Sequence, residues 1–326
     1  MASSEITTIA NYQAARKHEK YERLLERARA LQPLPTAVAH PCDESSLGAA
    51  VEAARIGLIA PLLVGPGDKI KATAQKYGYD LTGIEIIEAP HSHGAAARAV
   101  ELVREGRAEA LMKGSLHTDE LLGEVVKKET GLRTGRRISQ CFVMDVPGHD
   151  DALVITDAAV NIAPTLADKV DIVQNAIDLT HALGVDDVRV AILSAVETVN
   201  PNIPSTIEAA ALCKMADRGQ IKGATLDGPL AMDNAISAEA AKIKGIRSAV
   251  AGRANVLVAP DLEAGNVLAK SLSFLAQADA AGIVLGARVP IILTSRADSV
   301  TTRLASCAVA ALVAKARRED PTKAAA

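Results

Sequence analysis

The chain has 326 residues, of which 49% are hydrophobic and 23% charged, and 36 Lys and Arg against 39 Asp and Glu give a formal net charge of -3. This length predicts two domains or one large α/β unit, and the hydrophobic content excludes a disordered protein. The nearly neutral charge gives no sign of nucleic-acid binding. Only 2% of the residues are aromatic, which also argues against proteins that stack bases on aromatic rings.

The four cysteines, Cys42, Cys141, Cys213 and Cys307, lie far apart and form no CxxC pair. This spacing argues against a disulfide scaffold or a thiolate zinc site and predicts reduced, mostly buried thiols in a cytoplasmic protein. The polar N-terminal segment has no apolar core of a signal peptide. The apolar run 304–314 is shorter than the roughly 20 residues that span a bilayer, so it is interpreted as a buried helix.

Short apolar runs alternate with longer amphipathic segments. Many of the runs are continuous in Val, Ile and Leu, which is typical of strands buried on both faces of a parallel sheet. The alternation predicts an α/β architecture with right-handed crossovers. The expected strands are 36–39, 61–64, 84–88, 110–113, 138–144, 153–156, 188–193, 224–227, 256–259, 282–285 and 291–294. The expected helices are 12–29, 46–57, 69–77, 95–105, 119–130, 167–183, 206–217, 236–244, 264–278 and 299–317.

Lys113 ends one expected strand, and Ser115, His117 and Thr118 lead from it into a helix. The carboxyl end of a parallel strand next to a helix N-terminus is where α/β sheets bind anions. Ser115 and Thr118 could then donate hydrogen bonds to a phosphate while Lys113 supplies positive charge. The alternative is ordinary capping, with Thr118 as the N-cap and the acidic residues after it stabilising the helix dipole.

Arg133, Arg136 and Arg137 form the densest basic cluster and follow that loop closely in the sequence. They could hold a ligand with several phosphates. The alternative is a solvated basic loop. The nearby histidines, including His91 and His93, have no helical i, i+4 spacing and no carboxylate cluster beside them, so no metal is expected.

Two acidic, glycine-bearing loops follow successive expected strands, at 227–235 and 260–266. Asp227, Gly228, Asp233 and Asn266 are their candidate binding residues. Turn chemistry explains each of these residue types singly, but it explains less well why both loops carry so many.

A strongly apolar strand delivers Ser295 and Arg296 to the start of the last long helix. A guanidinium beside free helix N–H groups makes a good oxyanion or phosphate site. In the alternative, Asp298 or Ser299 is simply the N-cap and the two residues before it are exposed. No histidine lies nearby in the sequence and no Gly-x-Ser-x-Gly elbow is present, which argues against a hydrolase triad.

Taken in order, these stretches resemble the phosphate acetyltransferase/phosphate butyryltransferase family from about Thr36 to Ala314. The matching motifs are Lys-Gly-Ser-Leu-His-Thr at 113–118, Gly-Leu-Arg-Thr-Gly at 131–135, Ile-Thr-Asp-Ala-Ala-Val-Asn at 155–161, Asp-Gly-Pro-Leu at 227–230, Ala-Gly-Arg-Ala-Asn-Val-Leu at 251–257, Pro-Asp-Leu-Glu-Ala-Gly-Asn at 260–266 and Ser-Arg at 295–296. The chain looks closest to the transacylase part of enoyl-CoA hydratase/phosphate acetyltransferase fusions.

The resemblance implies two three-layer α/β domains with a cleft between them, as in isocitrate and isopropylmalate dehydrogenases. One domain would combine residues 1–137 and 287–326, and residues 138–286 would form the other. The implied protein is a cytoplasmic homodimer that needs no metal or other cofactor and binds neither nucleic acid nor a membrane. Its reaction would be acetyl-CoA + phosphate ⇌ acetyl phosphate + CoA, with acyl-CoA and inorganic phosphate as the substrates.

By resemblance, Ser295 positions the thiol or the phosphate, and Arg296 binds phosphate or the developing charge. The acetyltransferases of the family place an aspartate, proposed as the base, at the position of Thr302; Asp298 is the nearby acidic residue. An arginine of the family aligns with Gly123. Substrate contacts are expected from Lys113, Ser115, His117, Thr118, Arg133, Arg136, Arg137, Asp227, Gly228, Asp233 and Asn266.

Thr302 and Gly123 depart from the family's aspartate and arginine at these positions. The departures leave open a phosphate butyryltransferase, and also a non-catalytic regulatory or oligomerisation domain of the same fold. A dehydrogenase that shares the fold is disfavoured by the absence of a carboxylate cluster for a metal.

Overall fold

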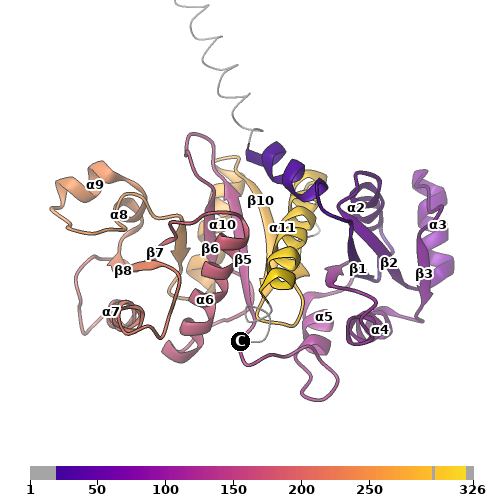
Figure 1. The fold of residues 1–326 in the computed structure, drawn as a ribbon, viewed down its shortest axis with the longest axis horizontal. Coiled ribbons are helices and arrows are strands. Elements are labelled where there is room, and N and C mark those ends of the chain that lie inside the picture. The colour runs from indigo at the N-terminus through magenta and orange to yellow at the C-terminus, as the bar shows by residue number, and fades with distance from the viewer. Residues whose placement is uncertain (1–19, 296–297, 321–326) are drawn as a thin grey trace, which may run out of the picture. The chain divides into compact units, whose positions relative to one another are not determined.

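The computed structural model describes residues 20–295 and 298–320 (Figure 1). Within them the chain divides into two compact units, one made of 21–136 with 281–320 and the other of Lys20 with 137–280. The domain boundaries expected from the sequence lie between 137 and 138 and between 286 and 287. The boundaries between the two compact units lie between 136 and 137 and between 280 and 281. The predicted helix 12–29 lies partly outside the described residues, and its described part is helical up to Arg29.

The unit of 21–136 and 281–320 contains a mostly parallel sheet in the order β3-β2-β1-β4-β11-β10. Its strands are β1 (Leu34–Ala39), β2 (Ile59–Gly65), β3 (Glu85–Glu88), β4 (Ala110–Lys113), β10 (Asp279–Leu285), which contains the boundary between the units, and β11 (Ile291–Ile292). Ala39 at the end of β1 lies opposite Lys113 at the end of β4, and β11 runs parallel to β4. The loops that follow β1, β4 and β11 therefore leave the sheet at the same edge.

Helices cover both faces of this sheet, and Figure 1 shows α2 and α4 on opposite sides of β1 and β2. The helices are α2 (Glu44–Arg55), α3 (Gly67–Tyr77), α4 (Ser92–Arg104), α5 (Thr118–Val125) and α11 (Val300–Glu319). Alanines are frequent on the buried faces of α2, α4 and α11, and these small side chains let the three helices approach the sheet closely. The run 304–314 is buried throughout, as the sequence predicts. Among the described residues, none of the helices combines the length and the apolar composition that a membrane span requires.

The unit of Lys20 and 137–280 contains a sheet in the order β5-β6-β9-β7-β8. Its strands are β5 (Ser139–Asp145), β6 (Leu153–Thr156), β7 (Arg189–Leu193), β8 (Thr225–Leu230) and β9 (Val256–Val258). Its helices are α6 (Leu166–Ala182), α7 (Pro204–Asp217), α8 (Met232–Ile236), α9 (Ala238–Ile243) and α10 (Leu262–Phe274). The strands β6, β9, β7 and β8 are parallel, so the loops that follow them also share one edge.

Several local predictions are wrong, each for a physical reason. The strand pairs β5–β6 and β10–β11 are antiparallel, which a continuous apolar run cannot distinguish from parallel pairing. Helix α5 ends at Val125 rather than at 130, because the Leu132 N–H turns back to donate to the Val125 carbonyl at 2.8 Å. The helix expected over 236–244 is α9, which begins at Ala238 because Ser237 leaves the helical conformation and caps it. The short helix α8 lies before it, in a segment expected to be a loop.

Candidate active site

The first group of candidate residues lies where β1, β4 and β11 end. Lys113 is the last residue of β4 and is only 6% exposed. The Gly114 and Ser115 N–H groups donate to the carbonyls of Ala39 and His40, both at 2.9 Å, so the loop after β4 continues to pair with the loop after β1. A Cβ at Gly114 would lie 2.3 Å from the Ala39 oxygen. This position therefore requires glycine and holds Lys113 and Ser115 at the strand edge.

His40 is a candidate that the sequence analysis missed. It follows β1 directly, has a left-handed backbone with φ of 54°, and is half-buried. Its Nδ1 lies 3.1 Å from the Ser115 Oγ, and that hydroxyl donates to the His40 carbonyl at 2.8 Å. Burial first, and then the charge of Lys69, hold the pKa of the His40 imidazole below its usual value despite the opposing charges of Glu120 and Asp43. A single histidine before Pro-Cys-Asp carries no motif, and only its place at the end of a predicted strand could have pointed to it.

The loop between β11 and α11 contains the predicted catalytic residues. The Ser295 N–H donates to the Asp298 carboxylate at 2.5 Å, and the Asp298 N–H donates to the Ser295 carbonyl at 3.2 Å. Asp298 thus closes the loop on itself, while the Ser299 hydroxyl caps α11 by accepting from the Thr302 N–H at 3.1 Å. The Ser295 side chain is exposed. Arg296 lies outside the described residues.

Arg303 is a second residue that the sequence analysis missed. It lies in the first turn of α11, is 3% exposed, and donates to the Ser295 carbonyl at 2.9 Å and to the Thr294 hydroxyl at 3.2 Å. It also donates to the Ser45 hydroxyl at 3.3 Å. The loop after β11 and the start of α2 are therefore joined through one buried guanidinium. An arginine directly before a buried apolar run is the signal that could have found it.

The start of α2 itself is capped by Asp43, which accepts from the Ser46 N–H at 2.8 Å and from the Ser46 hydroxyl at 2.6 Å. Burial alone would raise the pKa of the Asp43 carboxyl, but hydrogen bonds from Ser46 and Ser45 and the charge of Arg303 hold it below its usual value. Asp43 is therefore ionised at neutral pH and opposes the positive charge at this edge.

The remaining candidates of this unit lie around α5 and after it. The His117 N–H donates to the Glu120 carboxylate at 3.1 Å, and Thr118 is the first residue of α5 rather than its N-cap. The basic segment is fixed by its backbone: Arg133 pairs with Ala287, and the Arg136 N–H donates to the Thr134 hydroxyl at 3.1 Å.

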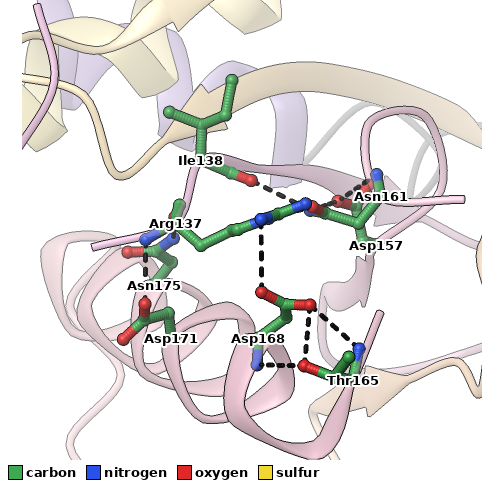
Figure 2. A network of polar contacts seen from close by, with 8 residues as sticks. All are labelled: Arg137, Ile138, Asp157, Asn161, Thr165, Asp168, Asp171 and Asn175. Atoms are coloured by element: carbon green, nitrogen blue, oxygen red, sulfur yellow. Dashed lines mark hydrogen bonds and ion pairs between the residues drawn. The ribbon is translucent and has the colours of Figure 1, made fainter. Parts of the chain in front are cut away.

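Arg137 belongs to the other unit, where it takes part in the polar network that Figure 2 shows. Its Nε donates to the Asn161 amide oxygen at 2.8 Å, and its guanidinium lies 3.3 Å from the Asp168 carboxylate. The network is anchored by Asp157, a buried carboxylate that accepts the N–H groups of 159, 160 and 161 at 3.0–3.1 Å and the Asn161 side-chain amide at 2.5 Å. The Arg137 side chain is exposed, and acidic and amide side chains set its orientation.

Residues of the two acidic segments of this unit contact neighbouring parts of the same unit. Asp227 and Gly228 are inside β8, not after it, and a Cβ at Gly228 would lie 2.8 Å from the Ile192 oxygen. Asp233 lies in the first turn of α8 and pairs with Lys244 at 3.2 Å. The Lys244 hydrogen bond, opposed by slight burial, holds the pKa of the Asp233 carboxyl below its usual value. Asn266 on α10 donates to the Ala158 carbonyl at 3.0 Å.

The structure thus brings Lys113, Ser115 and Ser295 to one edge of one sheet, where His40 and Arg303 join them. Arg137, Asp227, Asp233 and Asn266 belong to the other unit. In the described ranges, no group of three or more His, Cys, Asp or Glu side chains could hold a metal ion. The unit of 21–136 and 281–320 therefore has an α/β fold. The loops at the ends of its strands are suited to binding a small anionic ligand.

Comparison with known proteins agrees with this chemistry. The profile of a family described as "Phosphate acetyl/butaryl transferase" matches residues 92–311. The chain is 69% identical to a phosphate acetyltransferase of Rhizobium meliloti over 92% of this chain and 95% of the relative. It is 43% identical to a phosphate butyryltransferase of Clostridium acetobutylicum over 91% and 98%. The crystal structure of a branched-chain phosphotransacylase from Enterococcus faecalis V583 superposes with a TM-score of 0.75 at 30% identity, covering 86% of this chain and 98% of that one.

The chain is therefore an α/β acyltransferase. It belongs to the phosphate acetyl/butyryl transferase family, which confirms the resemblance found in its sequence.

Proposed function

We propose that the chain is a phosphate acetyltransferase, which transfers an acetyl group reversibly between CoA and inorganic phosphate. The observation that carries the proposal is the 69% identity, over nearly the whole of both chains, to the phosphate acetyltransferase of Rhizobium meliloti. The chemistry of the strand edge supports it, because the buried Lys113 and Arg303 bring positive charge to the loops that contain Ser115 and Ser295.

Positive charge at this edge has a clear chemical purpose. Phosphate must attack a thioester carbonyl while it lies among other anions, and cationic groups with N–H donors lower that repulsion and stabilise the tetrahedral oxyanion. In the proposal, Arg296 and Lys113 bind the phosphoryl group and Ser295 orients the reacting atoms. Asp298 holds the loop through its contacts with the Ser295 backbone.

The proposal extends to the second unit and to the assembly. Arg137, Asp227, Asp233 and Asn266 would contribute to acyl-CoA binding across a cleft, in a two-domain arrangement like that of isocitrate dehydrogenase. His117, Thr118, Arg133 and Arg136 would bind the CoA phosphates. The protein would act as a cytoplasmic homodimer without a metal; the free thiols of all four cysteines are compatible with a reducing compartment.

The decisive experiment measures phosphate-dependent release of CoA from acetyl-CoA by the whole chain. We expect turnover in the parent and a loss of at least about 100-fold in Arg296→Ala, as for removal of a charge-stabilising group. Arg55→Ala, which changes an exposed arginine of α2, is the matched control and should keep parental turnover. Absence of turnover in the parent would contradict the proposal and favour the regulatory domain.

The second candidate is a phosphate butyryltransferase, which the 43% identity to the Clostridium acetobutylicum protein favours. The two candidates differ only in the acyl group. A panel of acetyl-, propionyl-, butyryl- and isobutyryl-CoA at matched concentrations separates them through kcat/KM. We expect acetyl-CoA to give the highest value, and an equal or higher value for butyryl-CoA would overturn the acetyl assignment.

A further inference from the structure

The hydrogen bonds of Ser115 determine which nitrogen of His40 carries a proton. The Ser115 hydroxyl has one hydrogen and lies 2.8 Å from the His40 carbonyl, which can only accept, so the serine donates there. The Cys42 N–H can only donate, and it lies 3.2 Å from the same oxygen. The remaining contact, 3.1 Å to the His40 Nδ1, must then be donated by the imidazole. Neutral His40 therefore carries its proton on Nδ1 and has a lone pair on Nε2.

Nothing in the described ranges 20–295 and 298–320 forms a hydrogen bond with that Nε2. The ring is half-buried. The contact of its Nδ1 with Ser115 fixes the orientation of the imidazole. An imidazole held through Nδ1–H with a free Nε2 is the arrangement that general bases use in proteins.

The charges around His40 favour the neutral form. Burial and Lys69 of α3 disfavour imidazolium, whereas Glu120 of α5 and Asp43 at the start of α2 favour it. Their net effect lowers the pKa of His40, so the ring is neutral at pH 7. Asp43 is also near Arg303, which neutralises part of its influence.

His40 also lies at the correct edge of the sheet. Its loop leads to Ser45, and Ser45 and the Ser295 carbonyl bind the same Arg303 guanidinium, at 3.3 and 2.9 Å. Transfer from acetyl phosphate to CoA needs a base to remove the thiol proton. The acidic side chain nearest to Ser295 in the sequence, Asp298, has its carboxylate engaged by the Ser295 N–H at 2.5 Å.

We propose that His40 is the general base that accepts the CoA thiol proton on Nε2, an inference that rests on the proposed transacylase function. The sulfur forms a bond to the acetyl carbonyl carbon, and the bond from that carbon to the phosphate oxygen breaks. Phosphate leaves with the bonding electron pair and takes the proton from the His40 imidazolium, which gives acetyl-CoA and HPO₄²⁻. In the opposite direction the imidazolium returns the proton to the departing thiolate.

The variant His40→Asn tests this assignment with little disturbance of the fold. Asparagine tolerates a φ of 54° better than most residues, and its side-chain amide can donate to Ser115 as Nδ1–H does. It lacks only the base. His93→Asn, a change at an exposed histidine of α4, is the matched control. Acetyl-CoA formation from acetyl phosphate and CoA is followed from pH 5 to 9, together with CoA binding and thermal unfolding.

We expect kcat of His40→Asn to fall about 10²- to 10⁴-fold, with CoA binding and melting temperature nearly unchanged. The parental rate should rise with pH through a pKa below 6.5, and this acid limb should disappear in the variant. A variant with parental kcat and the same acid limb would overturn the proposal. A ¹⁵N–¹H spectrum that shows a protonated Nε2 in the neutral ring would also overturn it. An inactive parent would instead contradict the proposed function itself.

Discussion

The guanidinium of Arg303 donates to the backbone carbonyl of Ser295 at 2.9 Å from a position that is 3% exposed. A buried cation is expensive unless its donors are paired, and here Thr294 and Ser45 supply further acceptors. Its Nε has no hydrogen-bond partner in the described part of the chain. Arg303 therefore fixes the conformation of the Ser295 loop and adds positive potential at the strand edge where a phosphate would bind.

The variant Arg303→Met tests the hydrogen bonds and the positive charge of Arg303 apart from the volume that its side chain fills. Methionine fills a similar volume but provides neither the hydrogen bonds nor the charge. We expect a loss of about 1.5–3 kcal/mol in the free energy of unfolding, measured by urea denaturation, and at least a tenfold fall in kcat. Arg303→Lys keeps the charge without the fork, so it should recover stability only partly. Parental activity in Arg303→Met would show that the Ser295 loop does not depend on this contact.

Gly114 and Gly123 form a matched pair for testing the turn after β4. An added Cβ at Gly114 would meet the Ala39 and His40 carbonyl oxygens at 2.3 and 2.5 Å, so Gly114→Ala must displace backbone. We expect a loss of more than about 2 kcal/mol in stability and a large fall in turnover.

A Cβ at Gly123 on α5 meets nothing within 4 Å. Gly123→Ala should therefore stabilise the protein by about 0.5–1 kcal/mol and leave activity unchanged. Thermal unfolding and CoA release are measured on both variants to test whether the two positions differ in their tolerance of a Cβ. Equal stability of the two alanine variants would contradict the close approach at Gly114.

Most helices and strands can be predicted from the sequence, but the candidate active site can be predicted only in part. The bounds of β4 and β6 agree with the predicted 110–113 and 153–156, because short apolar runs between polar turns determine them locally. The antiparallel pairs and the break at Ser237 depend on tertiary pairing and on one cap, which periodicity does not record.

The candidate site shows the same limit. Lys113, Ser115 and Ser295 could be proposed because each lies at or just after the end of an expected strand. His40 and Arg303 could not, because their importance comes from contacts with residues 75 and 258 positions away in the chain. Part of the positive charge at the candidate site belongs to the buried Arg303, and the amino-acid composition does not reveal where that charge lies.

Asp43 gives a prediction for acid stability. Hydrogen bonds from Ser46 and Ser45 and the charge of Arg303 outweigh burial and lower the pKa of Asp43 from 3.8 in the folded protein. Its ionised form therefore adds stability that is fully present above pH 5 and is lost as the pH falls through the folded pKa, below 3.8. Asp43→Asn keeps a capping oxygen but removes the charge. We expect the difference in unfolding free energy between parent and variant to be constant from pH 5 to 8 and to shrink below pH 4. A difference that grows as the pH falls would contradict this sign.

The four cysteines give a prediction about inactivation. Burial raises the pKa of the Cys42 thiol to about 11 and those of Cys141, Cys213 and Cys307 to about 12. At pH 8 only about one Cys42 thiol in a thousand is then ionised, and the thiolate is the reactive form. We expect iodoacetamide at pH 8 to modify the native protein far more slowly than the urea-unfolded chain and to leave turnover unchanged. Cys42→Ala keeps the backbone N–H that contacts Ser115 and should likewise be fully active. Rapid inactivation that Cys42→Ala prevents would instead show that this thiol is exposed to the reagent and close to the bound substrate.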